Sequence, residues 1–212
     1  MALEKVFKFP LKHIGIIRGK SLIHSGVDFG WHKTHNCPVY AVGSGTVVST
    51  VIQPKGGQTV KILHDVKYNG KTIHTEYAHL QEDSLKVKKG QKVKYWQQIA
   101  NMGATGKVSG EHLHLNMYIG GKKVDPLKYL CLFSDQEATS NTLKKYKIHK
   151  AKKVVKCEEL NVRNKPNTKG KVVGTAKKGT EVGSFGTKDG WNIEDNIRGY
   201  YCSSKYVKWL KK

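Results

Sequence analysis

The sequence has little of several features that would point directly to a class of protein, such as cysteine pairs, long apolar runs or a signal peptide. Its 212 residues include only 5 prolines and 4 cysteines. No two cysteines form a CxxC pair, so neither a disulfide framework nor a thiolate zinc site is indicated. No apolar run approaches the roughly 18 residues of a membrane-spanning helix. The N-terminal segment lacks the apolar stretch of a signal peptide, so we expect synthesis in the cytoplasm of the producing cell and no membrane insertion.

Acidic residues are also scarce relative to basic ones. The chain has 38 Lys and Arg residues against 16 Asp and Glu residues, for a formal net charge of +22. Residues 1–130 and residues 131–212 each carry 19 basic and 8 acidic residues. This charge favours a polyanionic partner, either nucleic acid or the anionic polymers of a cell wall. We expect no nucleic-acid partner, because no helix-turn-helix, RNP or zinc-finger pattern accompanies the charge.

The hydrophobic pattern predicts an all-β fold. Apolar residues alternate with polar ones more often than they recur at helical spacing. The dipeptide Asn69-Gly70 tolerates the positive φ angles of a tight turn, which predicts an antiparallel hairpin on either side of it. The clearest predicted strands are Pro38 to Ile52, Gln58 to His64, Lys71 to Leu80 and Glu111 to Ile119.

A polar segment at residues 134–142 lacks periodic hydrophobics and predicts a linker. We therefore expect a first domain at residues 1–132 with its core at about 15–130, a linker at 133–149, and a second domain at 150–212. Short apolar runs between turn residues predict a compact five-stranded barrel in the second domain. These runs are Lys153 to Val155, Lys171 to Val173, Glu181 to Phe185, Trp191 to Ile193 and Arg198 to Tyr201.

Two of the ten histidines lie two residues apart in a predicted strand. Side chains of a strand alternate between its faces, so His112 and His114 leave the same face. The residues between and after them, Leu113, Leu115 and Met117, are expected to point into the core. The strand therefore presents two imidazoles side by side, as metal ligands or as catalytic bases.

A second group of candidate ligands lies upstream. His24 and Asp28 are four residues apart, and Gly26 allows the chain between them to curl. A catalytic zinc ion takes about three protein ligands and keeps one position open for water. His24, Asp28 and one histidine of the pair satisfy that count, and His79 closes the intervening strand. We expect the other histidines to be polar surface residues or residues that support the site, and His64 is the best candidate among them for a supporting role.

Each of these residues has an ordinary explanation when it is taken alone. A single histidine in a strand is more often a partly buried hydrogen-bonding residue than a ligand. Cys37, beside His35, can be read as a cysteine nucleophile, but a cysteine at the entry to a strand is more often a small buried apolar residue. The metal-site hypothesis depends on the whole set and its order.

Several motifs in unbroken order resemble the lysostaphin-type (LytM-like) zinc peptidases, which cut peptide bonds in bacterial peptidoglycan. The resemblance covers roughly residues 15 to 130. The motifs that carry it are His24 to Gly30, Pro38 to Ala41, Gly43 to Val47, Tyr77 to Leu80, Lys89 to Val93, Gly103 to Gly106 and His112 to Leu115. It implies an antiparallel β-sheet groove in which His24, Asp28 and His114 hold one zinc ion. It also implies that His79 and His112 stay unligated and serve catalysis.

The second domain resembles the bacterial SH3-like wall-binding domains. The segments that carry this resemblance are Leu160 to Pro166, Val172 to Thr175, Lys178 to Val182, Asp189 to Trp191 and Gly199 to Val207. It implies a small SH3-like β-barrel that binds peptidoglycan or anionic wall polymers.

The two resemblances together lead to one expected function. We expect a monomeric zinc endopeptidase that hydrolyses a peptide bond of the stem peptide or cross-bridge of a bacterial cell wall. The domain order and the N-terminus suggest a phage or prophage endolysin that acts on the wall after release. The alternatives are a non-catalytic wall-binding protein, and a secreted bacteriocin or autolysin with the same chemistry.

Overall fold

The computed structural model describes residues 7–30, 35–132, 136–138, 140–146, 149–150, 153–182, 187–188, 190–195 and 200–209. Strands dominate this part of the chain, and its one α-helix has seven residues. The prediction of a mostly β chain is therefore confirmed. None of the described helices is long and apolar enough to cross a membrane.

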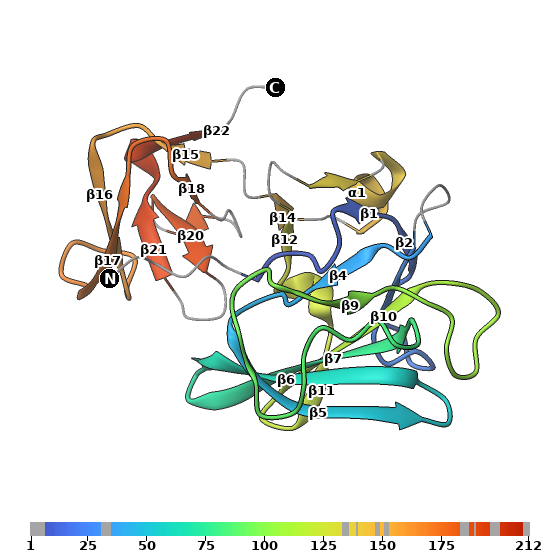
Figure 1. Cartoon of the computed structure of the whole chain (residues 1–212). Helices are drawn as coiled ribbons and strands as arrows, with labels where there is room; N and C mark the ends of the chain where they lie inside the picture. Colours follow the sequence, from blue (N-terminus) through green and yellow to red (C-terminus); the bar gives the residue numbers. More distant parts are fainter. Residues whose placement is uncertain are drawn as a thin grey trace.

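The first part of the chain is built around an eight-stranded sheet whose strand pairs are all antiparallel (Figure 1). In spatial order its strands are β2 (Ile16–Arg18), β3 (Val27–Phe29), β10 (Leu113–Ile119), β7 (Lys71–Leu80), β6 (Gly57–Tyr68), β5 (Gly45–Gln53) and β8 (Lys92–Val93), and β11 (Lys122–Val124) pairs with β10. The candidate site lies on the neighbouring strands β3, β10 and β7 of this sheet.

Shorter elements surround this sheet. Three two-stranded pairs join segments that are far apart in sequence. They are β1 (His13–Ile14) with β13 (Glu137–Ala138), β4 (Pro38–Tyr40) with β9 (Gln98–Asn101), and β12 (Cys131–Leu132) with β14 (His149–Lys150); the 3₁₀ turn η1 (Pro126–Lys128) and the helix α1 (Ser140–Tyr146) complete this part.

Strand alternation separates the core from the site, as the sequence predicts. On β10, Leu113, Leu115 and Met117 are fully buried in the main core. On β3, Val27 and Phe29 are likewise fully buried. The residues between them point to the other face because neighbouring side chains of a strand leave opposite faces. One face of the sheet is therefore core, and the other is free to carry polar groups.

The predicted hairpin is confirmed. Strands β6 and β7 pair antiparallel up to Tyr68 and Lys71. The two turn residues, Asn69 and Gly70, have φ angles of 47° and 76°, which is the left-handed region that this dipeptide tolerates.

The prediction of one continuous strand from Pro38 to Ile52 is wrong. The chain leaves the strand conformation at residues 41–44 and divides into β4 and β5. These strands belong to different sheets, since β4 pairs with β9 while β5 pairs with β6 and β8. An unbroken apolar pattern does not show a change of pairing partner, because both strands bury the same kinds of side chain.

The segment expected to be a linker contacts the first part of the chain. Strand β13 pairs in parallel with β1. The side chain of Gln136 is 5% exposed and donates to the carbonyls of Phe9 (2.9 Å) and Leu11 (2.6 Å). A buried amide with two such partners is held firmly. The domain boundaries themselves stay a prediction.

The C-terminal part contains a five-stranded and a three-stranded sheet, both antiparallel. Its elements are β15 (Lys153–Val155), β16 (Glu159–Arg163), β17 (Val172–Lys177), β18 (Glu181–Val182), β19 (Thr187–Lys188), β20 (Trp191–Asp195), β21 (Tyr200–Ser203), the 3₁₀ turn η2 (Ser204–Tyr206) and β22 (Val207–Trp209). Two predicted runs extend into residues 183–186 and 198–199, which lie outside the described residues. The SH3-like barrel stays a prediction.

His64 lies on the core side of β6 and does not contact the candidate site through any described hydrogen bond. Its Nδ1 donates to the carbonyl of Ser44 (3.2 Å), and its Nε2 lies 2.8 Å from the hydroxyl of Thr75. That hydroxyl is hydrogen bonded to Tyr77 (3.1 Å), whose phenol oxygen accepts from the amide of Val42 (2.9 Å). The single proton of the Thr75 hydroxyl is donated to Tyr77, and both ring nitrogens of His64 have a hydrogen-bond partner in the core.

We predict that the burial of His64 makes stability fall in mild acid. Burial lowers the pKa of His64 to about 4, against 6.5 for an ordinary histidine. The unfolded chain therefore takes up a proton between pH 6.5 and pH 4 that the folded chain refuses. This difference lowers the free energy of unfolding by about 3 kcal/mol across that window. Urea unfolding in the presence of a chelator, measured at pH 7, 5.5 and 4, checks this expectation.

The control is a pair of substitutions on neighbouring strands. His64→Gln is expected to be less stable at pH 7 but to show a shallower loss toward pH 4. His74→Gln, at a partly exposed position, is expected to keep most of the wild-type slope. An unchanged slope in His64→Gln would show that other groups cause the acid sensitivity.

Candidate metal centre

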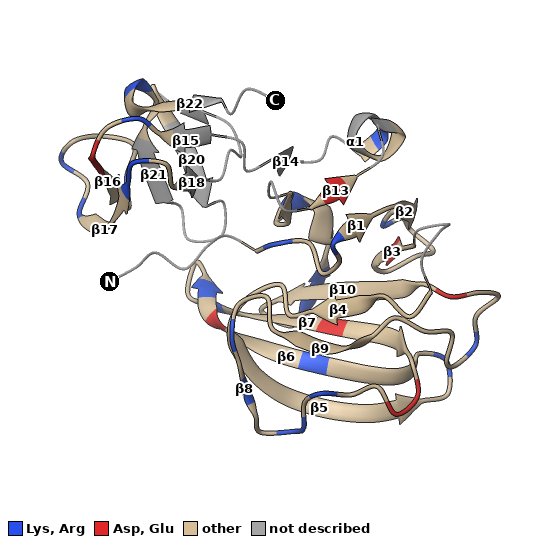
Figure 2. Ribbon diagram, turned by 45° about the horizontal axis from the view of Figure 1, so that its top comes forward, with Lys and Arg blue, Asp and Glu red and all other residues tan. Residues whose placement is uncertain are grey.

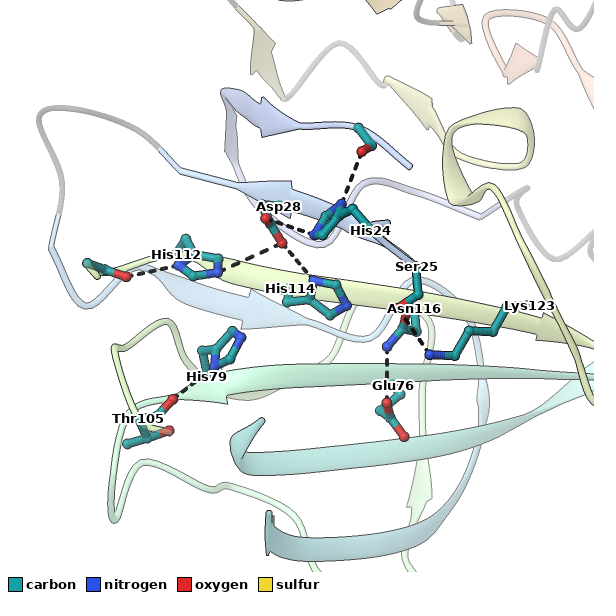
Figure 3. Close-up of polar contacts among 12 residues, drawn as sticks. His24, Ser25, Asp28, Glu76, His79, Thr105, His112, His114, Asn116 and Lys123 are labelled. Atoms are coloured by element: carbon teal, nitrogen blue, oxygen red, sulfur yellow. Dashed lines mark hydrogen bonds and ion pairs between the residues drawn. The ribbon is translucent and has the colours of Figure 1, made fainter. Parts of the chain in front are cut away.

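Asp28 lies at the centre of the candidate site, facing two imidazoles (Figure 3). It occupies the middle of β3, directly opposite His114 on β10. One carboxylate oxygen is 2.6 Å from Nδ1 of His114, and the other is 2.9 Å from Nε2 of His24. The three side chains are only 10–14% exposed. The ladder thus brings together residues that are 86 positions apart.

The three donor atoms fit one small metal ion. The ligand atoms of His24, Asp28 and His114 all lie within 4.8 Å of one another. Ligands on a tetrahedral zinc ion at about 2.0 Å stand about 3.3 Å apart, which is close to the separations seen here. Two imidazoles and one carboxylate also form the donor set of a catalytic zinc site, which keeps a fourth position open.

The other two predicted histidines line the same site. The ring of His79 lies 4.7 Å from that of His112 and 6.0 Å from that of His114, centroid to centroid. Nε2 of His112 is 3.8 Å from the nearer oxygen of Asp28. The structure therefore brings together all five residues that the sequence proposed. It leaves His79 and His112 outside the closest cluster of donor atoms.

Backbone carbonyls fix the orientation of three of the four imidazoles. In each case Nδ1 donates to a carbonyl oxygen, which leaves Nε2 without a proton. The pairs are His24 with Gly19 (3.0 Å), His79 with Thr105 (2.9 Å) and His112 with Gly110 (2.9 Å). Each Nε2 is then available as a metal ligand or as a proton acceptor.

The environment sets the charge of the groups in the site. Burial raises the pKa of Asp28, but the hydrogen bond from His114 and the charges of the imidazoles outweigh it, so the pKa lies below its ordinary value. Burial lowers the pKa of His79, and the neighbouring charges of His112 and His114 lower it further, against the hydrogen bond to Thr105. Near neutral pH the site thus holds a carboxylate and a neutral His79 ring.

Two backbone features of the site were not visible in the sequence. His79 has a φ angle of 61°, although it lies inside β7. For a residue with a side chain this conformation is strained, and such strain is concentrated at functional sites. Gly26 is needed for close approach rather than for the expected curl, because a Cβ there would lie against the carbonyl of Leu115 and 2.8 Å from Nε2 of His114.

A contact behind His24 was likewise not visible in the sequence. The ring of Tyr146, from α1, lies so close to Gly19 that a Cβ on the glycine would stand 2.9 Å from it. Gly19 is the residue whose carbonyl accepts from His24. Its contribution is a backbone atom and the absence of a side chain, so no residue pattern could have revealed it.

The fold and the donor set together define a candidate metal-binding site on one face of an antiparallel sheet. The model of peptidase family M23 matches residues 22–126, which contain all five site residues. Lipoprotein NlpD of Yersinia enterocolitica is 34% identical over 94 residues, which is 44% of this chain and 89% of that protein. This chain therefore belongs to peptidase family M23.

Two further relatives are matched over a smaller share of their own length. Peptidoglycan DD-endopeptidase ShyB of Vibrio cholerae is 38% identical over 112 residues, which is 53% of this chain but only 24% of ShyB. The match thus spans about a quarter of that relative. Among solved structures, Csd3 of Helicobacter pylori superposes with a TM-score of 0.50 at 24% identity, over 59% of this chain and 35% of that one. That likeness shows the fold.

We predict that His114, on β10, binds the metal and that His112, which directly precedes this strand, does not. His114→Ala removes a ligand atom and is expected to lose the bound zinc ion. His112→Ala is expected to retain about one ion per chain. Elemental analysis of folded, zinc-supplemented and desalted protein measures both. Full zinc content in His114→Ala would contradict this assignment.

We also predict that Tyr146 tunes the affinity for the metal. Tyr146→Ala is expected to free the Gly19 carbonyl and weaken zinc binding roughly tenfold, as is common when a group that orients a ligand is removed. Tyr146→Phe keeps the ring and is expected to bind zinc as the wild type does. Competition with a chromophoric chelator gives both affinities, and equal affinity in all three proteins would argue against the contact.

Proposed function

We propose that the chain is a zinc-dependent endopeptidase that hydrolyses a peptide bond in bacterial peptidoglycan. Membership of peptidase family M23 supports peptide-bond hydrolysis. The relatives ShyB and ShyA of Vibrio cholerae, named as peptidoglycan DD-endopeptidases, support the substrate. The observation that carries the proposal is the convergence of His24, Asp28 and His114, with His79 and His112 beside them, on one open face of the sheet.

His24, Asp28 and His114 are the residues that would hold the metal. A zinc ion bound there supplies Lewis-acid chemistry, polarising a carbonyl and making water acidic enough to react near neutral pH. Asp28 contributes the negative charge of the donor set. The carbonyl of Gly19 fixes the ring of His24 so that its Nε2 faces the other two ligands.

His79 and His112 provide the proton-transfer groups. Each has its Nδ1 hydrogen bonded to a backbone carbonyl, so the unprotonated Nε2 can take a proton. A positioned imidazole can accept the proton of the attacking water and later donate to the leaving amine, and the protonated ring stabilises an adjacent oxyanion. Because both rings have the same kind of orientation, either one suits either role.

The same five residues favour catalysis over a purely wall-binding function. A binding protein has no need for three metal ligands and two further oriented imidazoles at one point. In this chain each of the five side chains is present and faces the site.

The proposed function extends to the source of the enzyme and to its retention on the cell wall. We propose a phage or prophage endolysin, made in the cytoplasm of the producing cell and acting on the wall after release, with an SH3-like C-terminal domain as wall anchor. Basic residues occur over both parts of the chain (Figure 2), and the net charge of +22 favours retention on anionic wall polymers. A secreted bacteriocin or autolysin with the same chemistry is the alternative.

The proposal predicts that the protein clears a turbid suspension of purified bacterial cell walls. A chelator is expected to abolish clearing and added zinc to restore it. His79→Ala and His112→Ala are expected to lower the rate by roughly 10²–10⁴-fold, as the loss of a general acid or base does, without losing zinc. Mass spectrometry of the released fragments identifies the bond that is cut.

A histidine outside the site serves as the control. His13 contacts Glu137 (3.1 Å) near the edge of the fold, so His13→Ala is expected to clear walls at the wild-type rate. Walls that bind the zinc-loaded protein tightly but release no peptide fragments would refute the enzymatic function and favour the binding protein.

A further inference from the structure

The face that carries the metal ligands continues as a polar floor. Residues two apart on a strand share a face and lie about 7 Å apart along it. The next two rows beyond His114 and Ala78 are Asn116 opposite Glu76, and Tyr118 opposite His74. Neighbouring strands extend these rows, since Lys61 of β6 lies opposite Glu76 and Lys123 of β11 lies opposite Tyr118. The first charged side chain on this face, Glu76, therefore lies one row, or about 7 Å, from the candidate ligand His114.

Asn116 holds the carboxylate of Glu76 in place. The amide of Asn116 is 4% exposed, accepts from Ser25 (3.0 Å) and donates to Oε1 of Glu76 (3.1 Å). The hydroxyl of Tyr118 donates to the same oxygen (3.3 Å). Figure 3 shows Glu76 and Asn116 side by side, next to the histidine cluster. Both neutral donors thus use one oxygen, and the second oxygen makes no hydrogen bond within the described residues.

Two ammonium groups flank this carboxylate without pairing with it. Nζ of Lys61 lies 4.6 Å from the centre of the Tyr118 ring, and Nζ of Lys123 lies 5.7 Å from it. Lys123 also donates to the hydroxyl of Ser25 (3.0 Å). Within the described residues, Glu76 forms no ion pair closer than 4.0 Å. Burial, together with the negative charge of Glu76, raises the pKa of Tyr118 to about 12, so Tyr118 stays a neutral donor.

This arrangement differs from an ordinary structural ion pair. A lysine directly across a sheet from a glutamate usually closes the pair, because opposite charges on adjacent strands attract. Here the carboxylate is fixed by neutral donors, and both lysines are held over an aromatic ring beside it. One fixed anionic group and two fixed cationic groups thus remain on an accessible floor, in a chain with far more basic than acidic residues.

We propose that Glu76, Lys61 and Lys123 form a subsite for a zwitterionic amino-acid group of the substrate, an ammonium and a carboxylate borne on one carbon. The ammonium binds Glu76, and the carboxylate binds the two lysines. Such a group occurs at the free side-chain end of a diamino-dicarboxylic acid residue in a peptide. The inference rests on the proposed function, because it names the substrate class of the same site.

Binding of uncleavable peptides tests the subsite apart from turnover. The probes are three tripeptide amides that end in diaminopimelate, with the side-chain end either intact, converted to the carboxamide, or N-acetylated. The zinc-loaded full chain is expected to bind the intact form about tenfold more tightly than either modified form, since each modification removes a charge-assisted contact. Isothermal titration calorimetry measures the three affinities, and equal affinities would overturn the proposal.

Substitutions assign each charge. Glu76→Gln is expected to lose the discrimination against the N-acetylated peptide, while Lys61→Gln loses the discrimination against the carboxamide. Matched controls remove the same charges elsewhere: Glu82→Gln in an exposed turn, and Lys67→Gln at the exposed far end of β6. Both controls are expected to keep the wild-type order of affinities. Zinc content, measured for every variant, shows that the metal centre is intact.

The outcomes separate the subsite from the activity. Preferential binding of the intact peptide by a protein that releases no wall fragments supports the subsite and refutes the proposed peptidase. Wall hydrolysis without any preference among the three peptides refutes the subsite and leaves the peptidase standing. An equal loss of affinity for all three peptides in Glu76→Gln would show that Glu76 is only structural, which also overturns the proposal.

Discussion

The site depends on the register between β3 and β10. In this register Asp28 lies directly opposite His114, and the buried Val27 and Phe29 of β3 lie on the core side. A slip of one residue would turn Asp28 into the core and an apolar side chain into the site, because strand residues alternate between faces. The burial of Val27 and Phe29 therefore specifies the face on which Asp28 lies. The strand register that fills the hydrophobic core is the same register that assembles the candidate metal centre.

The same register accounts for the charge of Asp28. Burial alone would raise its pKa, yet the imidazole of His114 stands 2.6 Å away and keeps the carboxylate ionised. A buried carboxylate needs such partners, because its desolvation is costly. A metal ion in the same place provides still stronger compensation. The arrangement is stable only where cationic or donor groups surround Asp28, which suits a cation site.

The sequence predicted those parts of the fold that local periodicity controls. The alternation of His112 and His114 with buried leucines followed from the two-residue period, and the hairpin followed from Asn69-Gly70. Features set by distant contacts were missed: the break between β4 and β5, the strained φ of His79, and the packing of Tyr146 on Gly19. Each depends on which segments meet in space. The full ligand set likewise needed a family resemblance, since nothing in the spacing links His24 to His114.

The three candidate metal ligands are held to different degrees. Asp28 and His114 lie within paired strands, so the ladder fixes their backbone positions. His24 lies outside any strand. The two residues before it, Leu22 and Ile23, are 106% and 87% exposed. Its ring is oriented by the carbonyl of Gly19, a residue that packs against Tyr146 of α1. If a metal ion binds here as proposed, the loop before His24 is the part of the site whose order it would influence most, because His24 lies outside the paired strands. This coupling ties the affinity of the centre to a segment far along the chain.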